Sequence, residues 1–139
     1  MWYAILWWLR LLKLMRLKRK MLDHLDVRVR DLSRSIEFYK EILAPLEIAL
    51  RSQDAFGAIF GDEKNYIWLG EGKVKRIHFA FMANSRAQVE EFWQVGVELG
   101  ARLHSAPAQQ EANYYACYLF DPDGHLIEAV CHEKGDENG

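Results

Sequence analysis

The sequence predicts an α+β fold made of two copies of one strand–helix–strand–strand–strand unit, and two internal matches support this. Residues 24–29 and 37–39 are matched by similar residues 54 positions later, with a histidine opening each copy. Residues 60–68 are matched 60 positions later by Phe120–Glu128. Two such units are expected to pack about a pseudo-twofold axis as a cupped eight-stranded mixed sheet with one helix behind each half. An N-terminal amphipathic helix is expected outside the repeat.

In the first copy, His24–Val29 alternates polar and apolar residues, which is typical of a half-buried strand. Asp31 and Ser33 then provide caps for a helix that continues to Leu43 and stops near Pro45. Three short strands separated by turn-forming residues are expected next, at Glu47–Arg51, Ala55–Phe60 and Tyr66–Leu69.

The second copy repeats this plan with a longer connection. We expect a strand at Ile77–Met82 and a helix from Ser85 to Leu99, ended by Gly100. The remaining strands are predicted at Arg102–Ser105, Tyr114–Phe120 and Leu126–Cys131. The six residues that this copy has in excess fit a longer loop near Ala106–Ala112.

Alternation along each strand sorts the side chains between the two faces of the sheet. A five-residue loop at Asp121–His125 pairs Tyr118 with Glu128 and turns Cys117 and Cys131 toward the helix. Polar and aromatic side chains then gather on the opposite, concave face. This predicted face carries His24, Asp26, Arg28, Tyr66, Trp68, His78, Met82, Tyr114, Tyr118 and Glu128.

Length and composition limit the classes to which the protein can belong. With 139 residues, 50% of them hydrophobic, the chain is predicted to fold as one domain with a substantial core. Residues 1–20 carry six basic side chains and no acidic one, which leaves the remainder at a net charge of about −8 and argues against a nucleic-acid partner. The two cysteines lie in apolar runs without a C-x-x-C spacing, as expected of reduced core residues in a cytoplasmic protein.

The predicted domain, residues 21–132, contains the two modules at 21–70 and 77–132, and a polar tail follows at 133–139. Residues 1–20 are basic, amphipathic and rich in tryptophan. Their apolar run is shorter than the ~20 residues of a membrane-spanning helix. Two interpretations stay open. The segment is either a docking helix, for which we favour packing on protein over contact with a membrane surface, or an upstream extension without a function.

The doubled unit, the histidine that opens each copy and the D-P-D-G-H-L-I-E run at residues 121–128 resemble the vicinal oxygen chelate superfamily, over about residues 21–132. That superfamily includes glyoxalase I, extradiol dioxygenases, fosfomycin-resistance transferases and bleomycin-resistance proteins. The resemblance implies a homodimer and a divalent metal ion that binds a small substrate through two adjacent oxygen atoms.

The resemblance also implies the metal ligands, which are His24, His78 and Glu128. Glyoxalase I has a fourth ligand, a carboxylate, at the position of Trp68, so glyoxalase I activity is not expected. Two imidazoles and one carboxylate suit Fe, Mn, Zn or Ni. The alternative is a family member that has kept the fold and lost the metal.

Tyr118 matches the tyrosine ten residues before the ligand glutamate of extradiol dioxygenases and is the predicted catalytic residue, although the upstream histidine of those enzymes is missing. The predicted substrate-binding residues are Asp26, Arg28, Tyr66, Trp68, Met82 and Tyr114. An ion pair between Asp26 and Arg28 is the alternative for those two. We therefore expect a lyase, transferase or dioxygenase, or else a non-catalytic protein that sequesters an aromatic compound or an antibiotic, as bleomycin-resistance proteins do.

Overall fold

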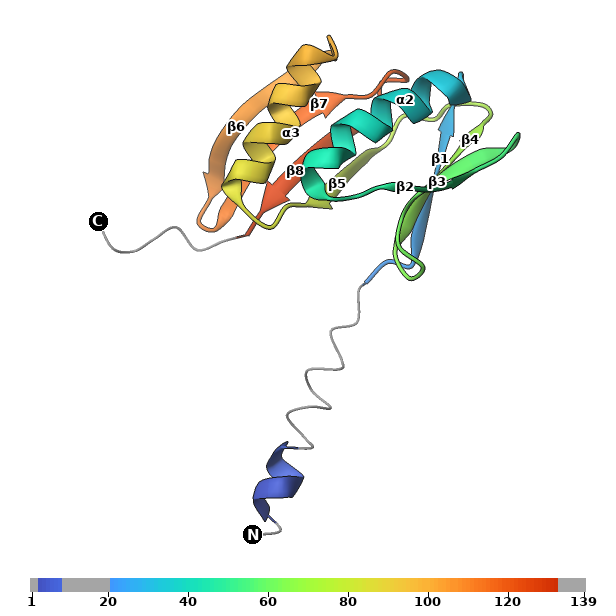
Figure 1. The fold of residues 1–139 in the computed structure, drawn as a ribbon. Coiled ribbons are helices and arrows are strands. Elements are labelled where there is room, and N and C mark those ends of the chain that lie inside the picture. The colour runs from blue at the N-terminus through green and yellow to red at the C-terminus, as the bar shows by residue number, and fades with distance from the viewer. Residues whose placement is uncertain (1–2, 9–20, 133–139) are drawn as a thin grey trace.

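The computed structural model describes residues 3–8 and 21–132, and Figure 1 shows their arrangement. The first module consists of β1 (His24–Val29), α2 (Leu32–Leu43), the 3-10 turn η1 (Ala44–Leu46), β2 (Leu50–Gln53), β3 (Gly57–Gly61) and β4 (Tyr66–Glu71). The second consists of β5 (His78–Met82), α3 (Arg86–Glu98), β6 (Leu103–Glu111), β7 (Tyr114–Phe120) and β8 (Leu126–Cys131). The element order within the modules is therefore as predicted.

The eight strands form two four-stranded mixed sheets of the same topology, ordered β1-β4-β3-β2 and β5-β8-β7-β6. The pairs β1–β4 and β5–β8 are parallel, and the others are antiparallel. His24 lies opposite Tyr66, and His78 lies opposite Leu126, as the offsets of 54 and 60 require. The strand register thus confirms the repeat, and it leaves β1 and β5 at one edge of each sheet.

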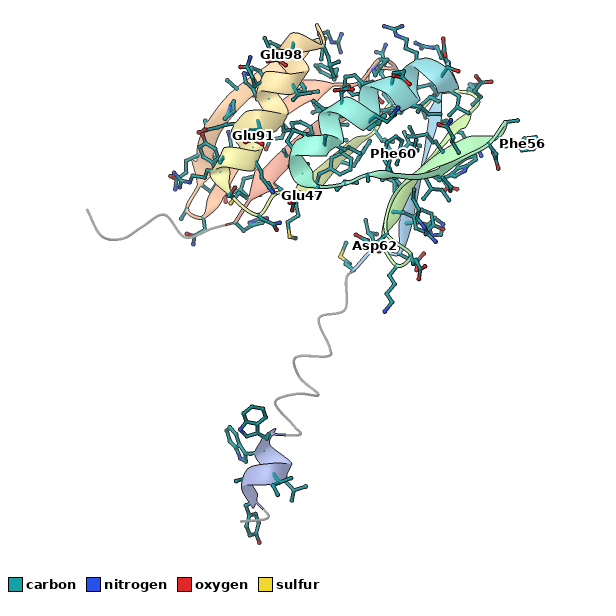
Figure 2. All side chains as sticks on the ribbon, in the orientation of Figure 1. Glu47, Phe56, Phe60, Asp62, Glu91 and Glu98 are labelled. Carbon is teal, nitrogen blue, oxygen red and sulfur yellow. The ribbon has the colours of Figure 1, made fainter. Side chains whose placement is uncertain are left out.

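One hydrophobic core lies behind both sheets, where α2 and α3 are side by side. The side chain of Asp31 caps α2, and that of Ser85 caps α3, because each accepts a hydrogen bond from a backbone N–H of the first turn. Phe60 points from β3 toward α2 and is 1% exposed (Figure 2). A Cβ atom at Gly96 would collide with the side chain of Leu119, so this glycine lets α3 approach β7 closely.

The largest differences from the predicted strand boundaries are in β2 and β6. Strand β2 begins at Leu50 rather than at Glu47, because Glu47 ends η1 in a left-handed conformation with φ of 59°. Strand β6 continues to Glu111, where the sequence suggested a loop at residues 106–112. Its register against β7 shifts at three places and it contains Pro107, which an edge strand tolerates because its outer N–H groups need no ladder partner. The extra residues therefore lengthen the β6–β7 hairpin.

Only part of the N-terminal segment belongs to the described residues. Residues 3–8 are helical, as predicted, but Trp7 and Trp8 are 70% and 68% exposed, so this helix does not bury them against its own domain. Residues 9–20 and the predicted tail at 133–139 lie outside the description. Within residues 3–8 and 21–132, no helix is long and apolar enough to cross a membrane.

Candidate metal and substrate site

The alternation along the strands exposes one open face on each sheet, away from the helices. The first face carries His24, Asp26 and Arg28 of β1 with Tyr66 and Trp68 of β4. The second face carries His78 and Met82 of β5, Tyr114 and Tyr118 of β7 and Glu128 of β8. Tyr118 pairs with Glu128 across the β7–β8 hairpin, and Cys117 turns the other way to meet Val89 of α3, both as predicted.

The centre of the second face is the carboxylate of Glu128, whose side chain is 3% exposed. The hydroxyl of Tyr114 donates a short hydrogen bond to its Oε1 atom. Nε2 of His78 lies 3.0 Å from its Oε2 atom. A buried carboxylate is stable only where its oxygens are paired, and here each oxygen has its own partner. Two of the three predicted metal ligands are therefore brought together.

The two tyrosines beside this carboxylate stay protonated. The hydrogen bond to Glu128, and then burial, raise the pKa of Tyr114 far above its usual value. Burial, followed by the charge of Glu128, also raises the pKa of Tyr118. Both phenols are thus protonated at neutral pH. In a catalytic role, Tyr118 would therefore donate a proton rather than accept one.

Two further histidines, which are not among the predicted site residues, border the second face. The ring of His104 lies 6.0 Å from that of Tyr118, and the ring of His132 meets that of Tyr114 edge-on at 5.1 Å. Each sits on or just beyond a strand next to a predicted site residue. His104 lies within the strand predicted at Arg102–Ser105, and its pairing next to Tyr118 was the signal that could have assigned it to this face.

On the first face, His24 has an acidic neighbour that the sequence reasoning missed. Its Nδ1 atom lies 2.7 Å from the carboxylate of Asp23, and this hydrogen bond is the main cause that raises the pKa of His24. The ring stacks on Tyr66 with centroids 5.1 Å apart. A carboxylate bonded to Nδ1 leaves Nε2 as the ring nitrogen available to a metal, which is a common arrangement around ligand histidines.

The indole of Trp68 packs directly on the backbone of two glycines. Cβ atoms at Gly57 and Gly70 would both collide with its indole. The guanidinium carbon of Arg28 lies 4.9 Å from the centre of the indole, and its Nη1 atom donates to the carbonyl of Glu71. Among the described residues, Arg28 forms no ion pair with Asp26. Arg28 is thus positioned by Trp68 and the Glu71 carbonyl.

The three predicted ligands do not converge within one chain. The part of the chain that the structure describes holds no group of three or more His, Cys, Asp and Glu side chains able to share a metal ion. His24 stands on the edge strand of one sheet, while His78 and Glu128 stand on the other sheet, and the two sheets are separate. The prediction that these three side chains meet on one concave face of a single chain was therefore wrong. The donor types themselves, two imidazoles and one carboxylate, fit a divalent metal.

The β7–β8 turn connects the two modules behind these faces. Asp121 accepts hydrogen bonds from the hydroxyl of Tyr39 at 2.7 Å and from the backbone N–H groups of Asp123 and His125. His125, 1% exposed, lies between the carbonyl of Arg28 on β1 and the N–H of Ile77, which precedes β5. The turn therefore fixes the two strands that begin with the predicted ligand histidines.

Comparisons with known proteins agree with this architecture. The model of the Glyoxalase/Bleomycin resistance protein/Dioxygenase superfamily matches residues 46–129. The chain is 26% identical over 118 residues to a protein of Shouchella clausii named Metallothiol transferase FosB, with 77% of each chain covered. Among solved structures, a glyoxalase/bleomycin resistance protein of Albidiferax ferrireducens superposes with a TM-score of 0.72 at 24% identity, covering 80% of this chain and 98% of that one. Lactoylglutathione lyase of Agrobacterium tumefaciens gives 0.66 at 17% identity, covering 81% and 94%. The two structural matches concern the fold alone.

Proposed function

Because this chain belongs to the Glyoxalase/Bleomycin resistance protein/Dioxygenase superfamily, we propose that it is a metal-dependent enzyme. His24, His78 and Glu128 would hold a divalent Fe, Mn, Zn or Ni ion, and a small substrate would bind through two adjacent oxygen atoms. The observation that carries this proposal is the pairing of Glu128 with His78 on an otherwise open face. The reaction would be of the lyase, transferase or dioxygenase type.

The charge of this ligand set favours an oxygen-rich, anionic substrate. Two neutral imidazoles and one carboxylate offset only part of a divalent charge, so a bound metal would stabilise negative charge on the substrate oxygens. Arg28 supports this assignment, because its guanidinium is held by Trp68 and by a carbonyl and not by a carboxylate of a described residue. Its role would be to bind an anionic group of the substrate.

The site would be assembled between two copies of the chain. Strands β1 and β5 each lie at a sheet edge, where backbone groups are available for pairing with another strand. A symmetric dimer that places β1 of one copy beside β5 of the other would bring His24 to His78 and Glu128 twice. It would also cover Met82, which is 73% exposed in the single chain.

Mixing two defective variants tests both the ligand set and the assembly. His24→Ala and Glu128→Ala should each lose bound metal, measured by elemental analysis after chelator-free purification. Co-expression should restore about a quarter of the wild-type metal content, since half of the dimers would be mixed and each would hold one intact site. Metal retained in either variant would refute the ligand assignment. No recovery in proven mixed dimers would refute the shared site.

The relatives named metallothiol transferases make a thiol the first cosubstrate to assay. The expected result is consumption of the thiol together with an oxygen-chelating acceptor, dependent on added metal. Catechols, diols and hydroxy acids are the next substrates to test, because each offers two adjacent oxygen atoms.

A second candidate function is non-catalytic binding of an aromatic compound or antibiotic. It is favoured by Trp68, which replaces a carboxylate and lies on Gly57 and Gly70 with Arg28 beside it. Such a surface binds planar ligands without a metal. Ligand binding that persists in EDTA and in Glu128→Ala would support this function over the enzyme, and binding lost in both would exclude it.

A further inference from the structure

The two oxygens of Glu128 have different partners. Oε1 accepts from the hydroxyl of Tyr114, whereas Oε2 faces Nε2 of His78 at 3.0 Å. The carboxylate is 3% exposed, so it has little freedom to exchange these oxygens. A buried acceptor that loses its donor costs about 1–3 kcal/mol, which favours keeping both partners in place.

The ring of Tyr114 is itself fixed. Tyr114 opens β7 directly after Asn113, which has a φ of 62° in the tight β6–β7 turn. His132 meets its ring edge-on, with the planes at 85°. The edge-on contact with His132, together with the hydrogen bond to Glu128, holds the phenol over the carboxylate.

We propose that Tyr114 is a positioning residue of the metal site, and this inference depends on the metal-dependent function proposed above. Tyr114 occupies Oε1, so Glu128 presents the single oxygen Oε2 toward His78. His78 has to release Glu128 in order to offer Nε2 as a ligand, while the contact of Tyr114 uses the other oxygen and is retained. Tyr114 therefore orients Glu128 in both the metal-free and the metal-bound protein, a role different from the substrate contact predicted from the sequence.

This role has a consequence for metal selectivity. One carboxylate oxygen with two imidazoles gives a compact, nitrogen-rich site of the kind that suits Zn²⁺. Without the hydroxyl of Tyr114, Glu128 is free to bind through both oxygens, and more carboxylate character suits Mn²⁺. Loss of this hydroxyl should therefore weaken Zn²⁺ binding more than Mn²⁺ binding.

The test compares Tyr114→Phe with Tyr115→Phe in the full-length protein. Tyr115 is the matched control, because its hydroxyl also donates to a glutamate, Glu90 at 2.9 Å, but on the opposite side of β7. Calorimetric titration with Zn²⁺ and Mn²⁺ should show Zn²⁺ affinity reduced roughly 10- to 100-fold in Tyr114→Phe, with a smaller loss for Mn²⁺. Tyr115→Phe should match the wild type for both metals.

The outcomes separate this inference from the proposed function. Wild-type protein that binds neither metal overturns both. Wild-type protein that binds metal while Tyr114→Phe binds it equally well, or loses both metals by one common factor, overturns only the positioning role. A second measurement needs no substitution: in NMR spectra of wild-type protein with isotope-labelled tyrosine, the Tyr114 signal should stay at its hydrogen-bonded position when Zn²⁺ is added, and a shift to the free-phenol position would contradict the inference.

Discussion

The two hairpin turns that follow β3 and β7 occupy corresponding places in the repeat, yet they make different contacts. In the first, Asp62 is exposed and accepts from the N–H groups of Lys64 and Asn65, both within the turn (Figure 2). In the second, Asp121 is 5% exposed and also binds Tyr39, which lies in the other module. The printed contacts of the first turn lie within its own module, whereas the second turn connects the two modules.

This difference shows how two similar units acquire separate roles. His125 of the second turn corresponds to Asn65 of the first, but it joins β1 to the start of β5. The side-chain amide of Asn65 donates instead to the carbonyl of Leu22, which precedes β1 of the same module. The open faces differ in the same way, because the position of Glu128 is occupied by Trp68 in the first module. One module supplies a carboxylate, and the other supplies an aromatic surface.

The largest expected effect concerns the two aspartates. Asp121→Ala removes the acceptor of one buried hydroxyl and two N–H groups, so the free energy of unfolding should fall by about 3–5 kcal/mol. Asp62→Ala removes an exposed turn acceptor and should cost about 1 kcal/mol or less. Urea denaturation of both variants measures the contrast. Equal losses would mean that the second turn does not connect the modules.

A smaller loss of stability is expected from substitutions at the glycines of the first face. Gly70→Ala places a Cβ atom into the indole of Trp68, and the displacement should cost about 1–3 kcal/mol and change tryptophan fluorescence. Gly72→Ala is the control, since its Cβ atom would meet the flexible side chain of Arg28 at 3.1 Å. A Gly70→Ala protein with unaltered fluorescence and stability would show that the position of Trp68 does not require a glycine at residue 70.

The smallest effect is expected for Tyr39, on the pH dependence of the free energy of unfolding. Burial, and then the charge of Asp121, raise the pKa of Tyr39 well above its usual value of 10.0. Above that pH the unfolded chain loses a proton that the folded protein keeps, so stability falls as the pH rises. Tyr39→Phe removes this contribution and should make the decline shallower by about 1.4 kcal/mol per pH unit. Parallel declines in alkaline urea titrations would contradict the assignment.

The repeat made most of the fold predictable. Two offsets in the sequence predicted the element order of both copies, and the five-residue loop at 121–125 fixed the register of the last hairpin. The length of β6 was missed because the six extra residues of the second copy were assigned to a loop at 106–112, whereas they extend an edge strand that also accepts Pro107. The start of β2 was missed because nothing near Glu47 signals its left-handed conformation.

The site was harder to predict than the fold. Alternation correctly assigned His78, Tyr114 and Glu128 to one face, because strand periodicity determines which side of a sheet a residue occupies. It carries no information on how two sheets are placed relative to each other, so the separation of His24 from this group could not be foreseen. The contact between Tyr114 and Glu128 depends on a diagonal reach between strands that spacing alone does not specify.

The packing of Trp68 on Gly57 and Gly70 also restricts how this protein can evolve. A carboxylate at position 68 would add a second carboxylate to the predicted ligand set of two histidines and Glu128, but it would leave the backbone of Gly57 and Gly70 uncovered. A larger residue at either glycine, introduced first, would collide with the indole. Each single step is therefore unfavourable, and the three positions have to change together. This epistasis makes the aromatic surface of the first module a feature that descendants of this sequence are expected to inherit.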